Sequence, residues 1–174
     1  MLLTSDEAGF NLLSSRMRTY APCGQTPIIQ QDCKYSHLSV IAAISPEGEI
    51  VSDILDGNFK GEQIVKFLKK LLATFKKEIH LLWDGAKCHC GEPVKTFLAT
   101  FPDAKRLFLY RIPPYSPELN PTEQLWNQAK NVVLKNVFSK DKKELRNKLN
   151  SVFDDFQLKK DTIKTFFYHP KVKF

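Results

Sequence analysis

A chain of 174 residues is the size of one domain, and its composition, 43% hydrophobic and 26% charged, is globular and excludes disordered and fibrous classes. The net charge is +7, and the excess of basic over acidic residues lies entirely in residues 129–174. This favours a polyanionic partner such as nucleic acid, although a lysine-rich solvated helix face gives the same pattern. No apolar run approaches the ~18 residues that span a bilayer, and no basic leader precedes Asp6, so we expect neither a membrane protein nor a secreted one.

The first third of the chain shows strand and turn signals. A short strand is predicted at residues 2–4, where it ends at the acidic pair Asp6-Glu7. Residues 16–31 hold a turn cluster between two short β-prone pieces. Residues 37–45 and 49–55 flank Pro46-Glu47-Gly48, which predicts a hairpin with glycine in its turn.

From Gly61 onward, helices and buried strands are predicted to alternate. Apolar residues recur at intervals of three and four after Gly61, as in an amphipathic helix. The continuous apolar runs 79–83 and 107–112 predict buried strands, the first ending at Asp84 and the second at a proline-rich segment. Helices are predicted at about 92–101 and from Asn120-Pro121 onward. About residues 137–174 are predicted to form a basic helical extension.

This order of elements predicts an α/β domain with one mixed sheet flanked by helices. We expect a single domain over residues 1–174, with a five-stranded, RNase H-like sheet and a basic helical C-terminal end. The pattern alone leaves the RNase H-like arrangement as one of several small mixed folds.

Three carboxylates fall where a sheet enzyme keeps its chemistry. Asp6 and Asp84 follow predicted strands, and Glu123 lies in the first turn of the third helix. Together they would repel one another unless cations bind, and oxygen-only ligands suit Mg²⁺ or Mn²⁺. Two such ions about 3.5–4 Å apart support phosphodiester displacement. Simpler explanations remain: either aspartate can start a turn, and Glu123 can complete a capping box with Asn120 as N-cap.

Three segments resemble the signature blocks of mariner-type DDE transposases, most closely the bacterial insertion-sequence branch. They are DEAGF at 6–10, WDGAKCH at 83–89 and PPYSPELNPTEQLW at 113–126. The last block is long and specific, the first is weak by itself, and the resemblance extends over nearly the whole chain.

The resemblance implies an RNase H-like fold and metal-dependent cleavage and joining of DNA strands. Asp6, Asp84 and Glu123 would be the D, D and E that bind two Mg²⁺ or Mn²⁺ ions, without a covalent protein–DNA intermediate. His89, Lys130 and Lys135 would be candidates for contact with nucleic acid. The partners would be transposon ends and target DNA, bound by a homodimer, in the bacterial cytoplasm.

Two departures from the family pattern affect what we expect of this chain. Gly85 stands where the family often has Asn after the second Asp, which leaves the ligand in place. The sequence begins five residues before Asp6, so we expect the helix-turn-helix region that recognises transposon ends to be absent. A nuclease that cuts without joining, or a DNA-binding remnant without catalysis, remain the alternatives.

The cysteines and the C-terminal residues allow other hypotheses. Cys23, Cys33, Cys88 and Cys90 need not form a disulfide framework, so we expect a reducing compartment. Zinc is disfavoured because Cys88-His89-Cys90 lacks the roughly two to four residues that separate structural zinc ligands, and adjacent Cys and His side chains point apart, which disfavours a thiol nucleophile. The aromatic run 166–169 could stack on bases, but fits the apolar face of a last helix or a dimer contact better. The basic residues of 140–148 could follow phosphates or form a solvated helix face: Lys140, Lys142, Lys143, Arg146 and Lys148.

Overall fold

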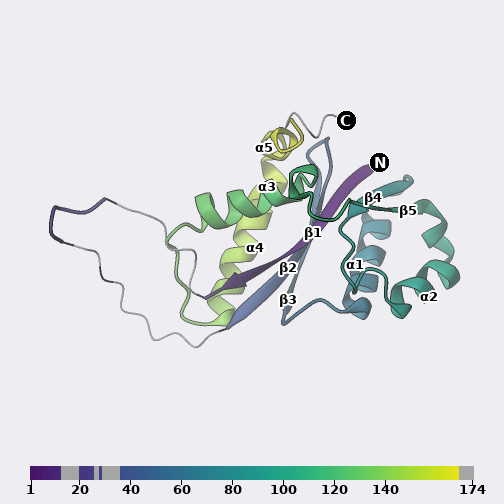
Figure 1. Ribbon diagram of the computed structural model, residues 1–174, viewed down its shortest axis with the longest axis horizontal. Helices are drawn as coiled ribbons and strands as arrows, with labels where there is room; N and C mark the ends of the chain where they lie inside the picture. The colour runs from purple at the N-terminus through teal and green to yellow at the C-terminus, as the bar shows by residue number, and fades with distance from the viewer. Residues whose placement is uncertain (13–19, 26–27, 29–35, 169–174) are drawn as a thin grey trace.

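A five-stranded mixed sheet forms the centre of the computed structural model, which describes residues 1–12, 20–25, 28 and 36–168 (Figure 1). The strand order is β3-β2-β1-β4-β5. The first three strands pair antiparallel, and β4 and β5 join β1 in parallel. The strands are β1 (Leu2–Asn11), β2 (His37–Ile44), β3 (Ile50–Asp56), β4 (Ile79–Trp83) and β5 (Leu107–Arg111). The predicted hairpin, the buried strand at 79–83 and the five-stranded sheet are confirmed. The strand predicted at 107–112 is present as β5, but its prediction as a buried strand is wrong, because β5 is an edge strand and exposes Phe108 and Tyr110.

The first strand is longer than predicted, because β1 continues through Asp6 instead of ending there. Its antiparallel pairing with β2 extends from Thr4↔Ile44 to Asn11↔His37, so backbone hydrogen bonds hold it extended along that length. The parallel pairing with β4, in contrast, stops at Thr4↔Leu82. Continuing that register by two residues brings Asp6 beside Asp84, so Asp6 lies where the parallel ladder ends and not where the strand ends.

Helices cover both faces of the sheet and enclose two hydrophobic cores (Figure 1). The helices α1 (Gly61–Thr74) and α2 (Glu92–Thr100) pack on one face, where Ile64, Phe67 and Leu71 are fully buried. On the other face lie α3 (Thr122–Asn127), α4 (Lys142–Leu158) and α5 (Lys160–Thr165). Within the described residues, no helix is both long enough and apolar enough to cross a membrane.

Short helical turns connect several of these elements. Turns of 3₁₀ type precede β5 at Pro102–Arg106 and follow the proline-rich segment at Pro117–Leu119. A π-helical turn, η3 (Gln128–Val133), continues α3 and is closed by a bond from the Leu134 N–H to the Ala129 carbonyl (2.9 Å). Such turns often occur at functional sites.

The basic C-terminal helices are attached to the sheet by ion pairs and by apolar side chains. Lys142 pairs with Asp56 at 2.5 Å, and Lys160 pairs with Glu49 at 2.6 Å. Phe166 and Phe167 are buried in the same core as α4, as expected for the apolar face of a last helix. His169 lies outside the described residues. Because Lys142 and Lys160 are engaged in these ion pairs, part of the positive charge of the C-terminal region serves structural contacts. For Lys142 this favours a place on a surface helix face over a contact with phosphates.

The early turn cluster is described only in part. The Gln25 N–H donates to the Pro22 carbonyl at 3.0 Å, which closes a turn. Cys33 and most of residues 16–31 lie outside the described residues. Cys23, Cys88 and Cys90 are free thiols.

The hairpin turn between β2 and β3 gives a test of this packing. Gly48 has φ of +86°, and a Cβ there would lie 2.5 Å from the Lys160 carbonyl oxygen, whereas Gly57, at φ of +97°, has open space around it. Both Gly→Ala variants should lose about 1–2 kcal/mol to backbone strain. We expect Gly48→Ala to lose about 1–3 kcal/mol more through the collision, measured by urea unfolding. Equal losses in the two variants would contradict the described contact.

Candidate active site

A cleft of about 410 Å³ opens at the carboxyl ends of β4 and β5. The proline-rich segment Pro113–Pro117 lines this cleft. Asp84 and Gly85, which directly follow β4, also line it. Asp6 and Glu123 also line the cleft. The structure therefore brings together the three carboxylates named from the sequence, which come from three separate parts of the chain.

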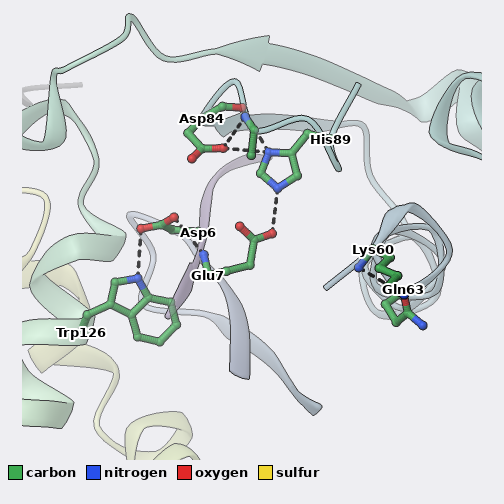
Figure 2. Close-up of polar contacts among 8 residues, drawn as sticks. Asp6, Glu7, Lys60, Gln63, Asp84, His89 and Trp126 are labelled. Atoms are coloured by element: carbon green, nitrogen blue, oxygen red, sulfur yellow. Dashed lines mark hydrogen bonds and ion pairs between the residues drawn. The ribbon is translucent and has the colours of Figure 1, made fainter. Parts of the chain in front are cut away.

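Asp6 is held by two donors, one on each carboxylate oxygen (Figure 2). The Glu7 backbone N–H donates to Oδ1 at 2.8 Å, and the Trp126 indole Nε1 donates to Oδ2 at 3.1 Å. Burial raises the pKa of Asp6 to about 7, and the charge of Glu123 adds to the rise, while both donors act in the other direction. The repulsion from Glu123 shows that these two carboxylates share one electrostatic site.

Glu123 is placed by α3, which is fixed to β1 by a buried contact. The hydroxyls of Thr4 and Thr122 lie 2.9 Å apart, two residues before Asp6 and one before Glu123. The helix begins later than predicted: Asn120 Oδ1 accepts from the Thr122 N–H at 3.2 Å, Pro121 is the N-cap, and Glu123 is the second helical residue. A capping box needs Glu123 as the third residue of the helix, so this explanation does not hold. The Glu123 side chain lines the cleft instead.

Asp84 is oriented by the loop that follows β4. Its Oδ1 accepts from the Ala86 N–H at 2.9 Å and lies 2.9 Å from His89 Nδ1. The Asp84 side chain is 52% exposed. One carboxylate oxygen is thus occupied by the protein, and the carboxylate borders the open cleft.

His89 connects Asp84 to Glu7, on the opposite face of β1 from Asp6 (Figure 2). Its Nε2 lies 2.7 Å from Glu7 Oε1, and its ring stacks on Trp83 with the centroids 4.2 Å apart. The side chain is 1% exposed. Burial opposes a charge on the ring, but the hydrogen bond and charge of Glu7, with Asp84, outweigh it and raise the pKa of His89. Nδ1 also lies 3.1 Å from the backbone carbonyl oxygen of Asp84. Because both ring nitrogens face only acceptor oxygens, the geometry fits a doubly protonated ring.

Cys88 lies beside this pair, with its Sγ within 4.8 Å of the Glu7 and His89 ligand atoms. Burial raises the pKa of the Cys88 thiol, and the Glu7 charge adds to the rise. A neutral thiol is a poor metal ligand, and the His89 nitrogens already face carboxylates. Glu7 and His89 are therefore better explained as a hydrogen-bonded pair, with Cys88 beside it, than as part of a zinc site.

Lys130 and Lys135 lie differently from each other. Lys130, on the π-helical turn η3, is half-buried with its Nζ 5.1 Å from the centre of the Phe10 ring. Burial lowers the pKa of Lys130, and the charges of Glu123 and Asp6 act in the other direction. Lys135 is exposed beyond that turn. Contacts of His89, Lys130 and Lys135 with nucleic acid remain predictions. Of the three residues, His89 is the least suited to a direct contact, because its side chain is buried.

The donor set fits hard divalent cations. Asp6, Asp84 and Glu123 offer carboxylate oxygens without nitrogen or sulfur, the chemistry that Mg²⁺ and Mn²⁺ prefer. Burial is the main cause of the raised pKa of Asp6 and the charge of Glu123 adds to it, so a bound cation would stabilise the charged form of this carboxylate.

Sequence reasoning missed three residues of this site: Glu7, Trp126 as a donor, and Arg111. Strand alternation could have indicated Glu7, because it puts adjacent acidic residues on opposite faces of β1. Trp126 ends the third sequence block, but that block does not indicate that its indole donates to Asp6. Nothing in the sequence indicated that Arg111 would border the cleft beside Gly85.

The comparisons with known proteins bear on the family and the fold of this chain. The profile of the DDE superfamily endonuclease family matches residues 1–146. Among solved structures, the Mos1 transposase paired-end complex with the left transposon end is similar with a TM-score of 0.67 and 14% identity, over 99% of this chain and 56% of that one. The Mos1 mariner paired end complex with Mg gives 0.68 and 15%, over 95% and 52%.

The catalytic domain of Mos1 mariner transposase is similar with a TM-score of 0.61 and 14% identity, over 95% of this chain and 78% of that one. At such identities the likeness shows the fold, and that fold is the RNase H-like sheet predicted from the sequence. The chain spans a little over half the length of the Mos1 chains in the DNA complexes. No curated protein matches this sequence.

Proposed function

Because this chain belongs to the DDE superfamily endonucleases, we propose that it is the catalytic part of a mariner-type transposase, which cleaves DNA and joins the freed 3′ end to target DNA. The observation that carries the proposal is the convergence of Asp6, Asp84 and Glu123 on one cleft. The pKa of Asp6, raised mainly by burial and further by the charge of Glu123, supports it, because a cation would offset both effects.

In this proposal Asp6, Asp84 and Glu123 hold two Mg²⁺ or Mn²⁺ ions. Such ions supply activation of the attacking oxygen and stabilisation of the leaving oxygen in phosphodiester displacement. The protein's own part is orientation: Trp126 and the Glu7 N–H fix Asp6, the Ala86 N–H and His89 fix Asp84, and the Thr4–Thr122 contact fixes the helix that carries Glu123.

The partners follow from the same proposal. The neighbouring Mos1 structures include complexes with transposon-end DNA and with Mg, and we extend to this chain a DNA substrate, transposon ends with target DNA, and a homodimer as the active form. The bacterial insertion-sequence branch, and with it the bacterial cytoplasm, belongs to the proposal on the strength of the sequence blocks.

The test is a strand-transfer assay that does not depend on recognition of transposon ends. A labelled oligonucleotide with a free 3′-hydroxyl is incubated with supercoiled plasmid and Mn²⁺. We expect the label to become covalently joined to the plasmid, and Asp84→Ala to remove the product. Nicking without joining would identify a nuclease instead. Neither product, together with DNA binding that ignores Mn²⁺, would identify a remnant without catalysis.

A further inference from the structure

Arg111 lies at the end of β5, beside the loop that carries Asp84. The register pairs Arg111 with Trp83, the residue before Asp84. Its side chain is exposed and lines the same cleft as the three carboxylates. A cation therefore borders a cleft whose other charged walls are acidic.

The guanidinium of Arg111 rests against the backbone of Gly85. Its Nη2 donates to the Gly85 carbonyl at 3.2 Å and contacts Cys90 Sγ at 3.4 Å. A Cβ on Gly85 would lie 2.5 Å from Arg111 Nε and 2.8 Å from Cζ. Since real Cβ atoms do not approach so closely, this position of Arg111 requires glycine directly after Asp84.

The contacts of Arg111 do not neutralise its charge. Across the described part of the chain no carboxylate forms an ion pair with it, whereas Arg106 lies 3.6 Å from Asp103 and caps carbonyls at the end of α1. Arginine presents a planar fork of donors that matches phosphate geometry. A held guanidinium that borders a catalytic cleft and lacks an acidic partner is suited to an anionic ligand.

We propose that Arg111, kept in place by Gly85, binds a backbone phosphate of the DNA strand that enters the cleft, next to the phosphodiester at the carboxylates. The inference rests on the proposed function and adds a subsite to it. Its ligand class is a phosphodiester, recognised by charge and shape and not by base sequence.

The test measures binding of a short fluorescein-labelled duplex by anisotropy, with Ca²⁺ in place of Mg²⁺ and over a series of salt concentrations. We expect Arg111→Gln to weaken binding roughly tenfold and to lower the slope of log K against log salt by about one. Gly85→Ala should weaken binding in the same direction without changing the net charge, because it displaces the guanidinium. Thermal unfolding confirms that each variant is folded.

The matched control is Lys70→Gln, which removes one positive charge at the β3 edge of the sheet, far from β5 in the strand order. Binding by Arg111→Gln and Gly85→Ala within twofold of Lys70→Gln would overturn the inference. If wild-type protein joins DNA and these variants do so equally well, the subsite alone is wrong. If wild-type protein neither binds nor joins DNA, the proposed function and the subsite are both wrong.

Discussion

Asp6→Asn is expected to remove metal-dependent DNA cleavage and, at the same time, to stabilise the metal-free fold at pH 8. The loss follows because the variant lacks one of the three proposed carboxylate ligands, and metal assistance is worth several kcal/mol, or roughly 10³-fold in rate. The gain follows because folding buries a carboxylate whose charge the surroundings disfavour, which raises its pKa from 3.8 to about 7. That difference corresponds to roughly 4 kcal/mol at most.

The gain in stability should be smaller than this bound, about 1–3 kcal/mol, because an asparagine amide cannot accept from both Trp126 and the Glu7 N–H. It should also depend on pH. Between pH 3.8 and about 7 the folded protein holds the Asp6 proton and the unfolded chain releases it. The free energy of unfolding of the wild type therefore falls as pH rises through this window, and in the variant this fall is absent.

Urea unfolding in EDTA at pH 5 and pH 8 measures both effects. Asp53→Asn, at an exposed position of β3, controls for the loss of one negative charge. Mn²⁺ should then stabilise the wild type at pH 8 more than the Asp6 variant, because it binds only the folded site. If the free energies of unfolding of the Asp6 variant and the wild type differ by the same amount at pH 5 and pH 8, Asp6 is not a buried carboxylate with a raised pKa.

The sheet could be predicted from the sequence where local patterns determine it. Continuous apolar runs identified the β4 and β5 strands, and glycine in a turn identified the β2–β3 hairpin. The length of β1 could not be predicted in this way, because its continuation past Asp6 depends on pairing with β2. Local signals ended the strand at the first acidic residue, whereas long-range backbone hydrogen bonds carry it onward.

The site could be predicted less completely than the sheet. The three carboxylates were named from their places after predicted strands and in the first turn of a helix, and the resemblance of their sequence blocks to a known family favoured them over the simpler explanations. Their supporting contacts join residues distant in sequence: Trp126 with Asp6, Glu7 with His89, and Arg111 with Gly85. Capping preferences placed Glu123 at the third helical position, but the Asn120 side chain and the buried Thr4–Thr122 contact make α3 begin one residue later.

His89→Phe is expected to weaken Mn²⁺ binding at the carboxylates by about 10–100-fold, the usual effect of losing a partner behind a metal ligand. Phenylalanine keeps the ring stacked on Trp83 but removes both nitrogens, so Asp84 keeps only the Ala86 N–H on its Oδ1. The carboxylate then turns more freely, and binding a cation must restrict that motion. Titration with Mn²⁺, followed by electron paramagnetic resonance, measures the affinity directly.

The variant also leaves the Glu7 carboxylate, which is 20% exposed, without its imidazole partner, at an expected cost of about 1–3 kcal/mol in stability. Glu7→Gln separates the two effects, because the amide oxygen still accepts from His89 Nε2 and holds the ring against Asp84. We expect Glu7→Gln to retain Mn²⁺ affinity within a few fold, and the double variant Glu7→Gln with His89→Phe to lose it as the single His89 variant does. Equal Mn²⁺ affinity in Glu7→Gln, His89→Phe and the double variant would mean that His89 fills space beside Trp83 without directing Asp84. The loop backbone alone would then orient the Asp84 carboxylate.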